Sequence, residues 1–230
     1  MKQSQISSVR PRQNRTGLHD YTKGEEILNV ISHATGALFG IFVLVFGILL
    51  SLKHNKPIGI PATVIYAFGM IFTYTVSSVY HGLSPNAGKR VLRVIDHCTI
   101  YLLIAGTYTG IMLTGMSENA PVVTAVILSV EWVVGILAIT LTAVDMKKYA
   151  VFSMICYIGL GWCIAVVPRA VIASLGIGGL IWLLCGGIAY TIGSVLYAAG
   201  HKKRYAHGVF HLFCLLGSVL QFVAFALFCF

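Results

Sequence analysis

The feature that most constrains this chain is a series of seven apolar segments, each long enough to cross a lipid bilayer. A helix rises about 1.5 Å per residue and the hydrocarbon layer is about 30 Å thick, so a crossing needs roughly 20 apolar residues. Because a backbone in lipid must satisfy its own hydrogen bonds, we expect these segments to be helices. The sequence therefore predicts an all-α integral membrane protein, a bundle of seven transmembrane helices. The predicted spans are Ile31 to Leu52, Ile60 to Gly82, Val94 to Gly115, Ala120 to Ala143, Tyr149 to Val167, Ala170 to Tyr197 and Gly208 to Phe230.

Composition and charge support a membrane protein and exclude a nucleic-acid-binding domain. The chain is 57% hydrophobic and only 10% charged, which is too much apolar surface for one soluble core. The formal net charge is +9, but the basic residues lie between the apolar segments, where anionic lipid and membrane orientation explain them. The expected organisation is a disordered basic cytoplasmic tail over residues 1–22 and a seven-helix transmembrane domain over residues 23–230, with membrane lipid as the partner.

The distribution of lysine and arginine predicts the orientation, because these residues are retained on the cytoplasmic side during insertion. Thirteen of the 16 lie in the N-terminal tail or in the second, fourth and sixth loops. The opposite loops hold three, namely Lys53, Lys56 and Arg169. We therefore predict a multi-pass protein of the plasma membrane with a cytoplasmic N terminus and an extracytoplasmic C terminus.

Three of the predicted spans carry polar side chains to one depth, at the cytoplasmic boundary. The second span ends with His81, and Ser77 lies one turn deeper. The third span starts at the same boundary and has Asp96 in its first turn, and the seventh starts there with His207 and His211. Ionisable groups in apolar spans are costly, so this convergence indicates a functional site.

The spacing of the histidines favours a metal site. His207 and His211 are four residues apart, on successive turns of one helical face, as in helical zinc motifs, and His81 supplies a third imidazole. Three histidines leave a tetrahedral zinc with an open position, which is typical of catalytic sites, and Asp96 would orient or deprotonate a water there. The alternative interpretation is that the histidines anchor the interface and Asp96 complements a helix dipole.

Four separated motifs carry a resemblance to a known family. They are EEILNVISHATGA (Glu25 to Ala37), SSVYHGL (Ser77 to Leu83), RVIDHCTIYLLIAGTYTG (Arg93 to Gly110) and HGVFHLFCLLGS (His207 to Ser218). The sequence resembles the hemolysin III family, the bacterial branch of the progestin and adipoQ receptors, from Glu25 to its end. The most specific part is the combination of SxxxH, Asp and HxxxH on the second, third and seventh spans.

The resemblance implies a zinc ion near the cytoplasmic side, held by His81, His207 and His211. It implies that Asp96 and Ser77 surround a water bound to that ion. His33, Glu26 and Asn29 belong to the first motif and are expected to support the ligands without binding the ion. These eight residues make up the predicted site.

The superfamily includes ceramide-cleaving amidases, so the resemblance implies a zinc-dependent hydrolase of lipid amide bonds or a regulator of membrane lipid state. Two alternatives remain open, a non-enzymatic sensor or receptor-like protein with structural zinc, and a pore-forming cytolysin. Two positions depart from the family pattern. Gln221 stands where many relatives have histidine, and Glu131 lies near the middle of the fourth span, where no acid is expected. We interpret Glu131 as a protonated, bundle-facing residue, with a proton relay as the alternative.

Overall fold

The computed structural model describes residues 21–200 and 203–230, and all the regular structure in those residues is helical. Six of its helices are long and apolar enough to cross a membrane, which confirms a helical membrane protein. The shorter α5 is also apolar. The elements are α1 (Lys23–Lys53), α2 (Gly59–Gly82), α3 (Ala87–Gly115), α4 (Pro121–Val144), α5 (Ala150–Gly161), the 3-10 helix η1 (Cys163–Val166), α6 (Pro168–Gly200) and α7 (Ala206–Phe228).

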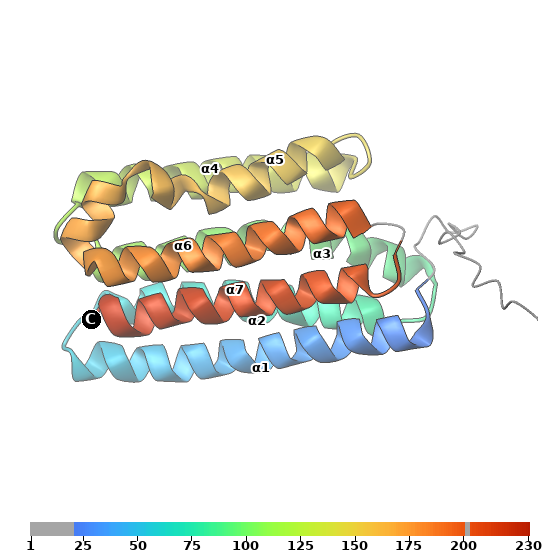
Figure 1. Ribbon diagram of the computed structural model, residues 1–230, viewed down its shortest axis with the longest axis horizontal. Helices are drawn as coiled ribbons and strands as arrows, with labels where there is room; N and C mark the ends of the chain where they lie inside the picture. The colour runs from blue at the N-terminus through green and yellow to red at the C-terminus, as the bar shows by residue number, and fades with distance from the viewer. Residues whose placement is uncertain (1–20, 201–202) are drawn as a thin grey trace, which may run out of the picture.

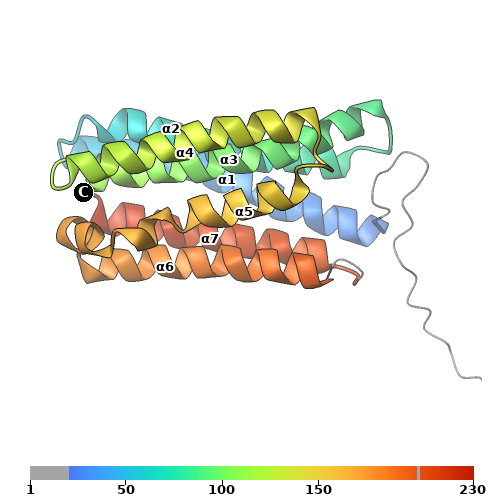
Figure 2. The same cartoon turned by 90° about the horizontal axis from the view of Figure 1, so that it is seen from above.

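The helices form one elongated bundle in which α1 to α4 pack in chain order and α7 returns to α1 (Figure 1). The helix α3 is central, because it contacts α2, α4, α5 and α7. The view turned by 90° shows that α5 runs beside α4 (Figure 2). The start of α1 and the C terminus lie at opposite ends of the bundle (Figure 1).

The fifth predicted span, Tyr149 to Val167, is not one continuous α-helix. The helix α5 is 12 residues long, and the chain continues as the four-residue η1. Gly159 and Gly161 lie at the end of α5, and glycine weakens a helix because it loses the most backbone freedom on ordering. Hydropathy does not register this break, since the segment stays apolar throughout.

The N-terminal caps extend α1 and α3 beyond the predicted spans. Thr22 and Glu25 form a capping box at the start of α1, in which each side chain bonds the other residue's backbone N–H. The Asn86 side chain accepts from the backbone N–H of Lys89 at 2.8 Å, so α3 begins at Ala87. Asp96 is consequently more than two turns inside α3, and the interpretation of it as a first-turn residue is wrong.

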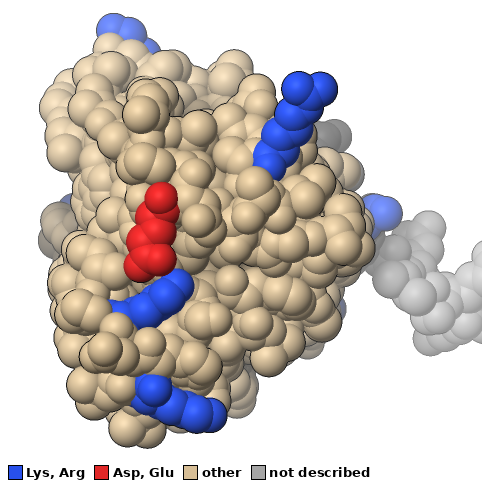
Figure 3. All heavy atoms as spheres, turned by 90° about the vertical axis from the view of Figure 1, so that its left-hand side faces the viewer, with Lys and Arg blue, Asp and Glu red and all other residues tan. Residues whose placement is uncertain are grey.

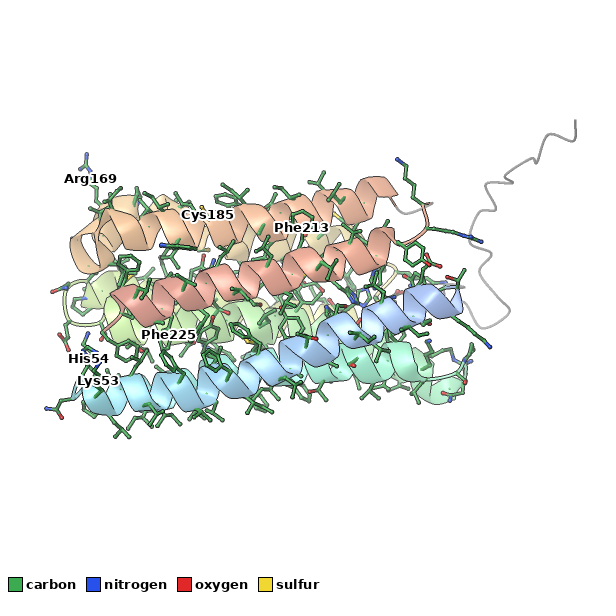
Figure 4. The ribbon with its side chains drawn as sticks, turned by 60° about the horizontal axis from the view of Figure 1, so that its bottom comes forward. Lys53, His54, Arg169, Cys185, Phe213 and Phe225 are labelled. Carbon is green, nitrogen blue, oxygen red and sulfur yellow. The ribbon has the colours of Figure 1, made fainter. Side chains whose placement is uncertain are left out.

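The two ends of the bundle differ in charge. The end with the C terminus shows a few scattered charged side chains on a mostly uncharged surface (Figure 3). Its cationic residues include Lys53 and Arg169, which lie at this end together with His54 (Figure 4). The end where α1 begins holds more of the described lysines and arginines, namely Lys23, Lys89, Arg90, Arg93, Lys147, Lys148, Lys203 and Arg204.

The largest hydrophobic core is formed mainly by residues of α2, α3, α6 and α7, and α1 contributes Val43 to it. Tyr66, Met70, Met112 and Phe225 are almost completely buried within it. The helices α2 and α3 approach closely at Gly69, where a Cβ atom would lie 2.4 Å from the carbonyl oxygen of Leu102. Small residues of this kind allow close helix packing in membranes.

Candidate metal centre

Three histidines from α2 and α7 converge at the end where α1 begins. The Nε2 atom of His207 lies 3.1 Å from His81 Nε2 and 3.0 Å from His211 Nε2. All three ligand atoms lie within 4.8 Å of one another, so this group can hold a metal ion. His81 and His211 are buried, with 2% and 1% of their surface exposed, and His207 is partly buried. The predicted ligand trio is therefore brought together.

The separations fit a single small cation. Metal–nitrogen bonds of about 2.0–2.1 Å in a tetrahedral site place two ligand nitrogens about 3.3 Å apart. The two shortest separations between the histidine nitrogens are close to that value. An imidazole nitrogen carries either one proton or one lone pair, so His207 Nε2 cannot bond well to both neighbours at once. A cation at the centre relieves this conflict.

A carboxylate that contacts Nδ1 orients the ring of His81. Its Nδ1 atom lies 2.6 Å from Glu26 Oε2, and Glu26 Oε1 accepts from Lys89 Nζ at 2.6 Å. A carboxylate on Nδ1 favours the tautomer with the proton there, which leaves the Nε2 lone pair for an ion. Lys89 is only 3% exposed and also donates to the carbonyl of Leu83 at 2.8 Å. Glu26 thus supports His81, and Lys89 holds Glu26 in place.

Two further side chains of α1 contact the ligand rings. The Asn29 amide lies 3.2 Å from His81 Nδ1, and the Ser32 hydroxyl lies 3.4 Å from His211 Nδ1. Ser32 also donates to the Asn29 carbonyl at 3.0 Å, which ties the two residues together. Asn29 therefore lies where the first motif suggested, and Ser32 was missed. Its place within that motif, one turn beyond Asn29, was the available signal.

His33 contacts a ligand by stacking. Its ring centroid lies 3.6 Å from that of His211 with the planes 13° apart, and its edge meets Tyr74 at 4.9 Å. Both of its ring nitrogens are buried without a hydrogen-bond partner among the described residues. His33 therefore supports the site through packing.

Ser77 and Asp96 lie on the α3 side of the trio. Ser77 is one turn from His81 on the same face of α2 and is 1% exposed. Asp96 is partly buried, lies within electrostatic range of His81 and is within hydrogen-bonding range of the Ser77 side chain. An acid and a buried hydroxyl thus flank the ligand trio.

Three tyrosines contact the rings of the trio, and no role was predicted for any of them from the sequence, although Tyr80 lies within the second motif. Tyr21 stacks on His207 with centroids 5.3 Å apart, Tyr197 meets His207 at the same distance, and Tyr80 meets His81 at 4.6 Å. Burial, together with the nearby Tyr197 phenol, raises the pKa of Tyr21, so this phenol stays neutral. The remainder of the predicted tail, residues 1–20, lies outside the described residues.

Known proteins share much of this sequence. The family model described as "Haemolysin-III related" matches residues 21–222. The chain is 32% identical to "Hemolysin-3" of Bacillus cereus over 198 residues, covering 86% of this chain and 89% of the relative. It is 31% identical to "Hemolysin-3 homolog" of Bacillus subtilis (strain 168) over 209 residues, covering 91% and 96%.

A more distant match links the chain to animal proteins. It is 27% identical to human "Monocyte to macrophage differentiation factor" over 171 residues, covering 70% of this chain and 67% of the relative. The resemblance inferred from the motifs is thereby confirmed, including the relation to the receptor branch. The family model and the bacterial relatives each cover most of the chain, and on that ground this protein belongs to the haemolysin-III related family.

Proposed function

We propose that this protein is a zinc-dependent hydrolase of lipid amide bonds, with ceramide-like substrates. The observation that carries the proposal is the buried histidine trio, in which Glu26 orients the His81 ring so that its Nε2 atom faces the other two. Three neutral histidines are the ligand set of catalytic zinc sites, which keep one position open. Zinc, when bound, supplies a Lewis acid that polarises a carbonyl and lowers the pKa of its water to about 7.

The residues around the trio have the chemistry that amide hydrolysis requires. Asp96 takes the proton of the attacking water and passes it to the leaving amine, as a general base and then a general acid. The Ser77 hydroxyl, which is buried beside Asp96, donates a hydrogen bond to the oxygen on which negative charge develops. The aromatic cover of Tyr21, Tyr80 and Tyr197 limits the access of bulk water.

We also propose that the chain crosses the plasma membrane seven times, with the N terminus in the cytoplasm. The 12 residues of α5 span about 18 Å and the four of η1 about 8 Å, together close to the hydrocarbon thickness. The excess of lysine and arginine at the end where α1 begins supports a cytoplasmic location for that end. The site then lies beneath the inner leaflet, where a head group is reachable from water and an acyl chain stays among lipids.

The test compares metal content with turnover in protein purified into lipid nanodiscs. We expect the wild type to contain zinc and to release fatty acid from ceramide. The variant D96N should keep its zinc and lose turnover by about 10²–10⁴-fold, because it lacks only the proton-transfer group. The variant E118Q alters an exposed acid at the opposite end and is the matched control. Zinc-loaded protein that hydrolyses neither ceramide nor related amides would rule out this chemistry.

A second candidate is a sensor in which the ion has only a structural role. The trio joins α2 to α7, and Glu26 and Asn29 tie α1 to it, so an ion there braces three helices. In that case D96N would leave function unchanged. The close filling of the core by side chains such as Tyr66, Met70 and Phe225 favours both candidates over a pore through the single bundle.

A further inference from the structure

The most unusual residue outside the metal centre is Glu131, in the middle of α4. It is 0% exposed, and both carboxyl oxygens are buried with no cationic partner among the described residues. Its neighbours Val130 and Val133 are on the outer surface, 40% and 66% exposed. Glu131 therefore points into the bundle, where an unpaired carboxylate is strongly disfavoured and the protonated acid is the stable form.

The titratable groups that face Glu131 are both uncharged acids. Tyr108 from α3 lies within electrostatic range of it, and the Cys163 thiol from η1 lies within hydrogen-bonding range. Neither can act as a positive partner, and Glu131 forms no ion pair in the described structure. A bound proton is therefore the only positive charge available to this carboxylate.

The same neighbours hold together the break between α5 and η1. The Tyr108 hydroxyl donates to the Gly161 carbonyl at 3.1 Å and accepts from the backbone N–H of Ile164 at 2.9 Å. It thus satisfies one backbone group on each side of the break, which lipid cannot do. The Cys163 thiol lies 3.5 Å from the Gly159 carbonyl. Any charge on Glu131 would act directly on the two side chains that bridge this break.

We propose that Glu131 is a proton-binding site whose occupancy keeps the α5–η1 break closed against α3 and α4. With the proton bound, the acid is neutral beside the Tyr108 oxygen and the Cys163 sulfur. Loss of the proton leaves a carboxylate that competes with the Gly161 and Gly159 carbonyls for the Tyr108 O–H and the Cys163 S–H, and this competition loosens the break. Discontinuous helices form the coupling-ion sites of many membrane transporters.

The ligand is a proton and not a sodium ion. Sodium sites at broken helices use free backbone carbonyl oxygens, but the Gly161 carbonyl is occupied by Tyr108 and the Gly159 carbonyl by Cys163. Tyr108 and Ile164 also line a small cavity that reaches Gln221 and has room for about one water molecule.

The first test measures the proton by chemical labelling of the wild type in nanodiscs. Dicyclohexylcarbodiimide is an apolar reagent that adds to protonated carboxyl groups in membranes, and the adduct is located by peptide mass spectrometry. We expect labelling of Glu131 at about pH 6 and a fall of at least about fivefold by about pH 9, because an ionised acid does not react. The exposed Glu118 should stay unlabelled. Absent or pH-independent labelling overturns the proposal. If Glu131 is labelled less in sodium chloride than in choline chloride, sodium competes for the site, and the assignment of a proton is overturned.

The second test links the proton to the break through hydrogen–deuterium exchange of residues 150–166. After correction for the intrinsic pH dependence, exchange in the wild type and in the E118Q control should rise over the range in which labelling falls. The variant E131Q cannot ionise, so its exchange should not change with pH. The variant Y108F lacks the bridging hydroxyl, so its exchange should be high at every pH while Glu131 is still labelled. If exchange in the wild type does not depend on pH, or if E131Q shows the same pH dependence, the coupling of the Glu131 proton to the break is overturned.

Discussion

The substitution E26Q tests the support of the metal centre most directly. Glu26 makes two 2.6 Å contacts, one with His81 Nδ1 and one with Lys89 Nζ. Glutamine keeps the length of the side chain and one acceptor oxygen, but it has no charge and only one of its two ends accepts. The His81 ring then loses a charge-assisted hydrogen bond, and Lys89, which is 3% exposed, loses its counter-ion.

Two separate losses follow from these contacts. Removal of a residue that orients a ligand typically costs 10–100-fold in metal affinity, which is about 1.4–2.7 kcal/mol. Breaking a buried ion pair costs about 3–5 kcal/mol, but the Glu26 side chain is 22% exposed and glutamine still accepts one bond. We therefore expect the free energy of unfolding to fall by about 1–3 kcal/mol.

The assay combines zinc competition against a chelator with thermal unfolding, both in detergent. The double variant E26Q/K89M removes the unpaired cation as well, so it should recover most of the lost stability while the zinc affinity stays low. The control E118Q should match the wild type in both measurements. Wild-type zinc affinity in E26Q would refute an orienting role for this carboxylate, as would recovery of affinity together with stability in the double variant.

Three further substitutions test packing. In G69A the new Cβ would lie 2.4 Å from the Leu102 carbonyl oxygen, so we expect a cost of about 1–3 kcal/mol and a lower melting temperature. G159A, whose Cβ meets nothing within 4 Å, should melt at or above the wild-type temperature, and equal melting of the two variants would contradict the close approach. H33F keeps a ring stacked on His211 and removes two buried nitrogens without partners, so stability and zinc content should both be retained. Loss of zinc in H33F would show that a His33 nitrogen is needed.

The sequence predicted the helices well because the bilayer imposes their length and their apolar character. It did not predict the break after Gly161, since an apolar window reports composition and not backbone hydrogen bonding. It also placed Asp96 too near a helix end, because the cap at Asn86 adds turns that hydropathy does not detect.

The candidate site was predicted in part for a similar reason. The i, i+4 spacing fixes His207 and His211 on one face of a helix, so their approach follows from local geometry. Their meeting with His81 depends on how α2 and α7 pack, which the shared depth of the residues suggested. Lys89 and Tyr21 were missed as site residues, since a loop lysine and a tail tyrosine carry no spacing signal.

The two proposed sites differ in the kind of helix that holds them. The histidines lie on the uninterrupted helices α2 and α7, both of which pack on α1, so their positions are fixed on rigid elements. Glu131 faces a broken helix whose two halves are bridged by the Tyr108 hydroxyl and the Cys163 thiol. A rigid ligand trio suits an ion that must keep its geometry, whereas a bridged break suits a group that changes charge. Substitution of Glu131 should therefore leave zinc content unchanged while it alters the exchange of α5, and a shared loss would mean that the two sites are one structural unit.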